Sequence, residues 1–237
     1  MGETVTEKNA IVLENLCDDL KSKKNVIGII LFGSLAKGNS HGYSDIDLFV
    51  IGHGEKHRTQ SYFHDGIQIQ IIWRSPEIFK DKVVKRTRTY PVSNTCKILY
   101  DKTGEIEEAI DQAKNNLTLG PLSLSDHDKL FKHADFSIEY YTIKGCIENG
   151  ELATAVYIIN EQVMLGIDLY YDKNNYYLVS PKHLISDLKT KNEALSSLAE
   201  SIILESSLNE KMSLFETFRE VILEIMGGEL TDYELYW

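Results

Sequence analysis

Short apolar runs and amphipathic stretches alternate along the first part of the chain. Residues 5–24 carry apolar side chains at helical spacing, which predicts a helix. Residues 26–32 form a continuous apolar run rich in β-branched side chains and of the length of a buried strand, and residues 46–51 form a second such run. The pattern therefore predicts one helix followed by two buried strands.

The next stretch is polar and then alternates with period two. Residues 52–60 are polar and predict a loop, and Asp65-Gly66 is a favoured hairpin turn. After this turn, apolar and polar residues alternate over residues 67–73, which predicts a strand with one buried face. The same alternation places Gln68 and Gln70 together on the other face.

Three further elements complete the first half. Residues 76–87 read as a helix with Ser75 as its N-cap and Pro76 at its first position. Residues 97–101 predict a strand, and residues 105–116 predict a short helix. We therefore expect a mixed β-sheet with flanking helices over residues 1–118.

The pattern changes after Leu119-Gly120-Pro121 to long helical periods. The expected helical segments are residues 126–148, 151–171, 181–188, 193–206 and 209–226. We therefore expect an all-α helical bundle of four or five helices over residues 119–237. The predicted fold class is α+β, with a mixed-sheet domain followed by this bundle.

The charge of the chain is unevenly distributed. The net charge of its 237 residues is −11, yet residues 1–118 contain sixteen Lys and Arg and sixteen Asp and Glu. The whole acidic excess lies in residues 119–237. An acidic body repels a nucleic-acid backbone, so we expect no nucleic-acid partner. The excess suits a cationic small substrate, and it also serves solubility.

Neither a membrane span nor a secretion signal is visible in the sequence. No apolar run approaches the roughly 20 residues that cross a bilayer. The polar first nine residues lack the apolar core of a signal peptide. We therefore expect a cytoplasmic protein with no membrane partner.

The candidate chemistry lies where the first strand ends and the second begins. The first strand ends at Gly33-Ser34, where amide groups at a helix start suit phosphate oxygens and Ser34 adds a hydroxyl donor. Asp45 and Asp47 open the second strand, and residues two apart project from one face, about 6–7 Å apart along it. Two carboxylates held this way can share divalent cations. A phosphate cradle beside a Mg²⁺ carboxylate pair suits attack on a nucleotide phosphate.

These residues resemble a known signature. Gly33-Ser34, Gly38 and the run Tyr43-Ser44-Asp45-Ile46-Asp47 look like the motif of the DNA polymerase beta-type nucleotidyltransferase superfamily. The chain is most similar in pattern to kanamycin nucleotidyltransferase-like and minimal nucleotidyltransferase proteins with a C-terminal helical domain. The resemblance extends through roughly the first hundred residues.

The resemblance implies an activity and roles for individual residues. Gly33, Ser34 and Ser44 would bind the nucleotide, and Asp45 and Asp47 would be catalytic and hold two Mg²⁺ ions. The implied reaction moves a nucleoside monophosphate, with ATP or another NTP as donor and AMP as the expected group, onto a hydroxyl. The implied acceptor is a small molecule such as an aminoglycoside or lincosamide antibiotic.

Gln70 departs from the family pattern. The family carries a third catalytic carboxylate on the strand after the hairpin, at the position that aligns with Gln70. Glutamine can offer a neutral oxygen to a cation but cannot accept a proton. Three interpretations stay open: a carboxylate of the second domain supplies the base, the acceptor is already nucleophilic and the reaction slow, or the site binds a nucleotide without turning it over.

The second half resembles the helical domain of kanamycin nucleotidyltransferase-like proteins. That domain closes the acceptor pocket and often mediates dimers, so the resemblance leaves a homodimer open. Candidate bases on this side are Asp135, Glu139 and Glu161. Lys182 matches the lysine of a Tyr…Pro-Lys stretch that reaches nucleotide phosphates in some of these proteins.

Two classes of function follow. The first is a Mg²⁺-dependent nucleotidyltransferase acting on a small-molecule hydroxyl or, as a protein AMPylator, on a protein side chain. The second is a catalytically impaired nucleotide-binding protein of regulatory or antitoxin type, which Gln70 favours. Release of pyrophosphate from ATP and Mg²⁺ distinguishes the two.

Overall fold

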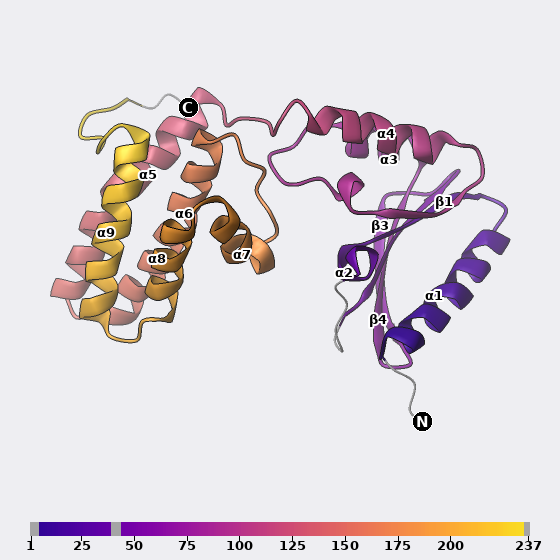
Figure 1. Cartoon of the computed structure of the whole chain (residues 1–237), viewed down its shortest axis with the longest axis horizontal. Helices are drawn as coiled ribbons and strands as arrows, with labels where there is room; N and C mark the ends of the chain where they lie inside the picture. Colours follow the sequence, from indigo (N-terminus) through magenta and orange to yellow (C-terminus); the bar gives the residue numbers. More distant parts are fainter. Residues whose placement is uncertain (1–4, 39–43, 235–237) are drawn as a thin grey trace. The chain divides into compact units, whose positions relative to one another are not determined.

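A computed structural model describes residues 5–38 and 44–234, with side chains from Lys8 onward (Figure 1). The chain divides into two compact units. Unit 1 takes in the described residues of Met1–Thr87 together with Pro91–Leu119. Unit 2 takes in Arg88–Tyr90 and the described residues of Gly120–Trp237.

Unit 1 is a five-stranded mixed sheet with helices on both faces. Its strands have the order β3-β4-β2-β1-β5, and β2 and β4 are parallel while the other neighbours are antiparallel. The elements are α1 (Val5–Ser22), β1 (Val26–Phe32), α2 (Gly33–Lys37), β2 (Ile46–Gly52), β3 (Arg58–His64), β4 (Ile67–Arg74), α3 (Pro76–Val84), η1 (Val92–Asn94), β5 (Lys97–Asp101) and α4 (Glu105–Leu117). The predicted mixed sheet is confirmed. The loop expected over residues 52–60 is wrong at its end, because β3 begins at Arg58.

Local signals set two of the connections. Asp65 and Gly66 both have positive φ, 51° and 78°, which is the backbone of a type I′ hairpin turn and matches the twist of β3 and β4. The Ser75 hydroxyl accepts a hydrogen bond from the Ile78 amide at 3.3 Å, so Ser75 caps α3 as predicted. These contacts need only neighbouring residues, which is why the sequence predicted them.

The two faces of the sheet pack on different helices (Figure 1). One face packs on α1 through alternate strand residues such as Ile29, Leu48 and Ile69. The opposite face packs on α3 and α4, and Ile30, Ile51, Phe79, Ile106 and Ile110 are buried there. Each fully buried Leu or Ile contributes about 1.5–3 kcal/mol. Because strand residues alternate, Asp47 shares the α3–α4 face with Ile51, four positions further along β2.

Unit 2 is a helical bundle, as predicted, and its described residues form α5 (Asp126–Glu148), α6 (Leu152–Lys173), α7 (Pro181–Lys191), α8 (Glu193–Leu204) and α9 (Leu208–Met226). Its core is one buried cluster that includes Phe136 of α5, Ile159 of α6 and Phe218 of α9. A methyl group on Gly166 would lie 2.5 Å from the Phe218 ring, so this glycine allows close packing of α6. The α+β fold class is confirmed.

Helix α6 is the apolar centre of this bundle. Within residues 5–38 and 44–234 it alone is long and apolar enough to cross a membrane by length and composition. A helix that contributes to the core of a bundle can have the same length and composition. Ile159, Val163 and Ile167 of α6 are buried in the cluster of unit 2.

A three-residue segment from the first half of the sequence forms part of unit 2. The Leu178 amide donates to the Arg88 carbonyl at 2.9 Å, and the Tyr90 amide donates to the Leu178 carbonyl at 2.6 Å. The Arg88 guanidinium also binds the Asp168 carboxylate at 2.7 Å, and Lys132 binds the same carboxylate. Burial alone would raise the pKa of Asp168, but these two hydrogen-bonded cations outweigh it and hold the pKa below its usual range.

Candidate functional site

The Asp47 carboxylate lies directly against the backbone of Gly33. Phe32, at the end of β1, is the cross-strand partner of Asp47. A methyl group on the Gly33 Cα would overlap Oδ2 of Asp47 and lie 3.2 Å from its Cγ. Gly33 also has a φ of 77°, which glycine adopts without strain. The two halves of the sequence motif therefore adjoin in the fold, and they do so through a contact that only glycine allows.

Ser34, the residue after Gly33, has a hydroxyl group that lacks a hydrogen-bond partner among the described residues. Its Oγ is buried and has no hydrogen-bond partner in the part of the chain that the structure describes. A buried hydroxyl without a partner is unfavourable in the protein alone, by about 1–3 kcal/mol. A phosphate oxygen would satisfy it, so the hydroxyl predicted to bind phosphate has the donor capacity that this role needs.

The remaining motif residues flank this point. Ser44 is buried and Asp45 is half-buried, and both directly precede β2. Gly38 ends α2 with a φ of 75° in the left-handed region. Tyr43 lies outside the described residues. Asp45 and Asp47 therefore lie at the start of the central strand β2, and the contact with Gly33 places the Asp47 carboxylate beside the turn after β1.

Gln70 lies next to Asp47 across the parallel pair β2–β4. The register pairs Asp47 with Gln70, and the antiparallel register of β3 and β4 pairs Gln70 with Ser61. Partners in register project from the same face, so the three side chains form a row across three strands. Gln68 lies on this face too, and its amide donates to the Ser61 hydroxyl at 3.2 Å. The row contains one carboxylate, one amide and one hydroxyl.

The carboxylates at the start of β2 fit one class of metal. Among the described residues, no group of three or more His, Cys, Asp and Glu is placed to hold a metal ion. Mg²⁺ is commonly bound by one or two carboxylates together with substrate phosphates. The Asp47 carboxylate, which lies against Gly33 next to Ser34, therefore suits Mg²⁺ that arrives with a nucleotide, and Asp45, two residues earlier in the chain, is the second candidate ligand.

An arginine that sequence analysis did not single out lies on the same face. Arg74 is two alternations beyond Gln70 on β4, and its guanidinium lies 5.0 Å from the centre of the Phe49 ring. Phe49 in turn stacks on Phe32 with ring centres 4.4 Å apart. Burial lowers the pKa of the Arg74 guanidinium. The sequence could have indicated this position, because residues 70, 72 and 74 of a strand project from one face.

The candidate bases of the helical half come together within unit 2. Asp135 accepts a hydrogen bond from the Gln162 amide at 3.4 Å, and Glu161 accepts one from the Tyr157 hydroxyl at 2.6 Å. Burial raises the pKa of Glu139, and the charges of Asp135 and Glu161 raise it further. Asp135 and Glu161 therefore lie close enough to Glu139 for their charges to act on it, and the raised pKa means that Glu139 holds a proton more tightly than an ordinary glutamate.

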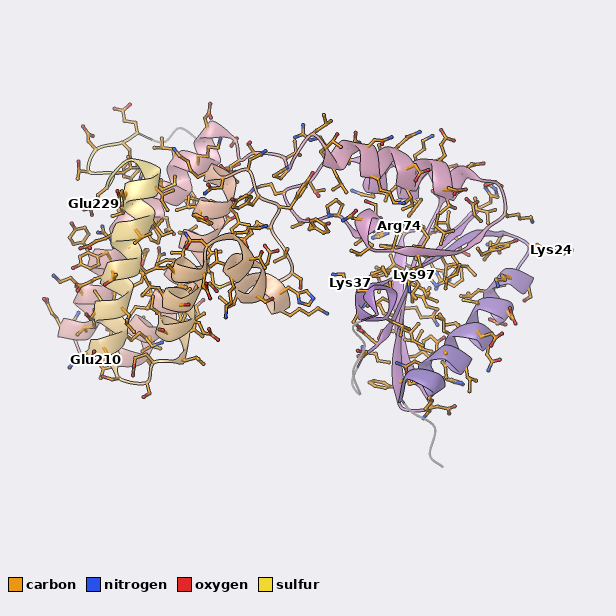
Figure 2. All side chains as sticks on the ribbon, viewed as in Figure 1. Lys24, Lys37, Arg74, Lys97, Glu210 and Glu229 are labelled. Carbon is orange, nitrogen blue, oxygen red and sulfur yellow. The ribbon has the colours of Figure 1, made fainter. Side chains whose placement is uncertain are left out.

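Lys182 is exposed near the start of α7 in unit 2. In unit 1, Figure 2 labels Lys37 on the short helix α2 and Arg74 on the strand β4, among other cations. The contact expected between Lys182 and nucleotide phosphates stays a prediction.

Comparison with known proteins identifies the same part of the chain. Residues 13–113 match the family model of the nucleotidyltransferase domain. This segment contains the Gly33–Ser34 turn, Asp45, Asp47 and Gln70, and the match supports the nucleotidyltransferase superfamily and a nucleotidyl transfer function. The closer resemblance to kanamycin-type proteins stays a prediction.

Comparison with curated protein sequences finds no significant match. Among solved structures, a nucleotidyltransferase-like protein from Exiguobacterium sibiricum aligns with 89% of this chain and 73% of its own, at 11% identity and a TM-score of 0.48. A likeness at this identity and TM-score carries no argument about function.

Proposed function

We propose that unit 1 is the catalytic part of an enzyme that transfers a nucleoside monophosphate from a nucleoside triphosphate to an acceptor hydroxyl. The observation that carries the proposal is the contact between the Asp47 carboxylate and Gly33, beside the unpaired Ser34 hydroxyl. A cation-binding carboxylate and a phosphate-binding donor are adjacent there. The family match over residues 13–113 supports the same reaction class.

The residues of the turn bind and orient the triphosphate. The Ser34 hydroxyl donates to a phosphate oxygen, and the absence of a side chain on Gly33 lets the Asp47 carboxylate lie against the turn beside it. Asp45 and Asp47 would hold two Mg²⁺ ions, which would neutralise charge on the phosphates and lower the pKa of an acceptor hydroxyl. ATP is the proposed donor, and pyrophosphate leaves.

The proton of the acceptor hydroxyl does not go to Gln70. An amide oxygen is far too weak a base, so Gln70 contributes at most a neutral ligand or a hydrogen bond. The proton therefore goes to solvent or to a carboxylate outside the row Asp47–Gln70–Ser61. We expect slow turnover with acceptors of ordinary hydroxyl pKa.

Substitution of one carboxylate tests the proposal. Asp47→Asn keeps the size of the side chain and removes its charge, and we expect it to abolish transfer of label from [α-³²P]ATP while the thermal unfolding midpoint stays near that of the wild type. Asp65→Asn is the matched control, because Asp65 lies in the β3–β4 turn and asparagine tolerates its positive φ. Aminoglycosides, lincosamides and cell lysate serve as acceptors. Full activity of Asp47→Asn would reject the mechanism.

A second candidate function rests on Gln70. Its register beside Asp47 leaves the row without a second carboxylate, as a nucleotide-binding regulatory protein would tolerate. Such a protein binds ATP and Mg²⁺ without releasing pyrophosphate against any acceptor. Release of pyrophosphate in the presence of lysate would support the transferase over the regulatory protein.

A further inference from the structure

Within residues 5–38 and 44–234, Arg74 differs from the other four arginines in having no hydrogen-bonded or ionic partner. Four arginines are paired: Arg58 with the Glu55 carboxylate at 3.6 Å, Arg86 with the Leu119 carbonyl at 2.9 Å, Arg88 with Asp168, and Arg219 with the Glu229 carboxylate at 2.6 Å. For Arg74, the described residues supply neither a hydrogen bond nor an ion pair, and its Nε is buried. Its guanidinium contacts the Phe49 ring, with 5.0 Å from Cζ to the ring centre.

This arrangement is unfavourable for folding alone. A guanidinium carries five N–H donors and stays charged, and removing part of it from water without an acceptor costs free energy. Stacking on an aromatic ring recovers only about 0.5–2 kcal/mol. A strand position that merely covers Phe49 is better filled by an apolar side chain, so the cation has no evident structural role.

The position of Arg74 connects it to the candidate site. Gln70 and Arg74 lie on one face of β4, and Asp47 and Phe49 lie on the same face of the neighbouring strand β2. The Arg74 guanidinium lies over Phe49, which is two residues from Asp47. Phe49 stacks on Phe32, which directly precedes the Gly33–Ser34 turn. The guanidinium is therefore directed back along the strand toward the row of Asp47 and Gln70.

We propose that Arg74 is an oxyanion-binding residue of this site, which takes a phosphate or carboxylate group of a substrate through its unpaired N–H donors. The planar fork of a guanidinium matches these groups with two parallel hydrogen bonds. The identity of the substrate rests on the proposed nucleotidyl transfer, whereas oxyanion binding itself does not. The group belongs either to the nucleotide donor or to the acceptor.

If the oxyanion belongs to the acceptor, the expected class of acceptor changes. The acidic excess that suits a cationic antibiotic lies entirely in residues 119–237, and residues 1–118 are balanced in charge. If Arg74 binds the acceptor, the acceptor carries a phosphate or carboxylate near its reactive hydroxyl. An aminoglycoside would then be a poor acceptor, because its ammonium groups would meet a partly buried cation.

The test uses the full chain with Arg74→Met, Arg74→Lys and the control Arg58→Met. Arg58 also stacks on an aromatic ring, Trp73 at 4.4 Å, but it is paired with Glu55. Binding of the α,β-methylene analogue of ATP with Mg²⁺ is measured by calorimetry. Inorganic phosphate is then titrated into protein saturated with this analogue. Unfolding midpoints are recorded with and without each ligand.

Two patterns support the proposal. If Arg74 binds the donor, Arg74→Met lowers the affinity for the nucleotide analogue by about 10- to 100-fold, as expected for the loss of hydrogen bonds to a charged group. If it binds the acceptor, the nucleotide affinity is unchanged and phosphate binding in the presence of the analogue falls by a similar factor. In both cases Arg74→Lys is weakened less than Arg74→Met, and Arg58→Met binds as the wild type does.

Two results would overturn it. Equal affinities of wild type and Arg74→Met for both the nucleotide analogue and phosphate exclude an oxyanion role. A clear fall in the ligand-free unfolding midpoint of Arg74→Met, with no change in binding, assigns Arg74 to structure. Since these measurements use no turnover, an inactive protein that still binds oxyanions through Arg74 refutes the transferase and leaves this inference intact.

Discussion

Gly33→Ala is the substitution for which the structure makes the sharpest prediction, because Gly33 carries no functional group. Its φ of 77° lies in the left-handed region, where an alanine is less stable than glycine by about 1–2 kcal/mol. Its added methyl group would also overlap Oδ2 of Asp47. An ordinary contact between carbon and oxygen is about 3.3–3.6 Å, so the carboxylate or the turn has to move by about 1 Å or more.

These two effects act on different measurements. The backbone term lowers stability, whereas displacement of the carboxylate lowers binding of Mg²⁺-nucleotide and transfer. A misplacement of about 1 Å can reduce a reaction rate by about 100-fold. We therefore expect Gly33→Ala to lose about 1–3 kcal/mol of unfolding free energy and at least about 100-fold in transfer.

Gly66→Ala is the matched control. Gly66 has a φ of 78° in the β3–β4 turn of the same sheet, but nothing lies within 4 Å of the position its methyl group would take. This variant therefore carries the backbone term without the clash. Urea unfolding compares the stabilities, and calorimetry with the α,β-methylene analogue of ATP compares binding. If Gly33→Ala binds the analogue as tightly as Gly66→Ala does, the contact between Gly33 and Asp47 does not organise the site.

Two further predictions concern unit 2. Arg88→Met removes a cation from the half-buried Asp168 carboxylate and should lower the unfolding free energy by about 1.5–3 kcal/mol at neutral pH. The pKa of Asp168 is lowered, so the stabilisation is present at pH values above the usual aspartate range and is lost as the pH falls through the folded-state pKa. Urea unfolding should therefore show a smaller stability difference between wild type and Arg88→Met at acidic pH than at neutral pH. A difference that stays constant with pH would contradict the ion pair. Glu139→Gln should raise the unfolding midpoint at neutral pH, because burial and two neighbouring carboxylates raise the pKa of Glu139 and its ionised form is unfavourable in the fold. Because this pKa is raised, ionised Glu139 destabilises the fold only as the pH rises above the usual glutamate range. Calorimetric scans should therefore show the unfolding midpoint of Glu139→Gln exceeding that of the wild type by more at neutral pH than at acidic pH. Equal midpoints at neutral pH would contradict the interaction.

Sequence analysis predicted the elements whose causes are local. The apolar run of β1, the Ser75 cap of α3 and the Asp65-Gly66 turn all depend on a few neighbouring residues. It missed the start of β3 at Arg58, because β3 is an edge strand with mostly exposed side chains. Backbone hydrogen bonds to β4 hold β3 in the sheet, and such bonds leave no pattern of apolar and polar side chains in the sequence.

The motif itself also followed from sequence, but the geometry of the site did not. The order Gly33-Ser34, Asp45, Asp47 indicated a phosphate and cation site, since adjacent strands are joined there by a short connection. The contact between Gly33 and the Asp47 carboxylate depends on the antiparallel register of β1 and β2. The approach of Gln70 depends on the parallel register of β2 and β4, segments that are separated by a whole hairpin.

Arg74 shows the difference most clearly. The sequence determined its parity with Gln70 along the strand, because that depends only on the alternation of side chains. Only the tertiary structure decided that Phe49 lies under its guanidinium and that no acidic side chain in the described parts of the chain pairs with it. Whether a charge is paired depends on the packing of residues remote in sequence, and the periodicity of a single strand carries no information about that packing.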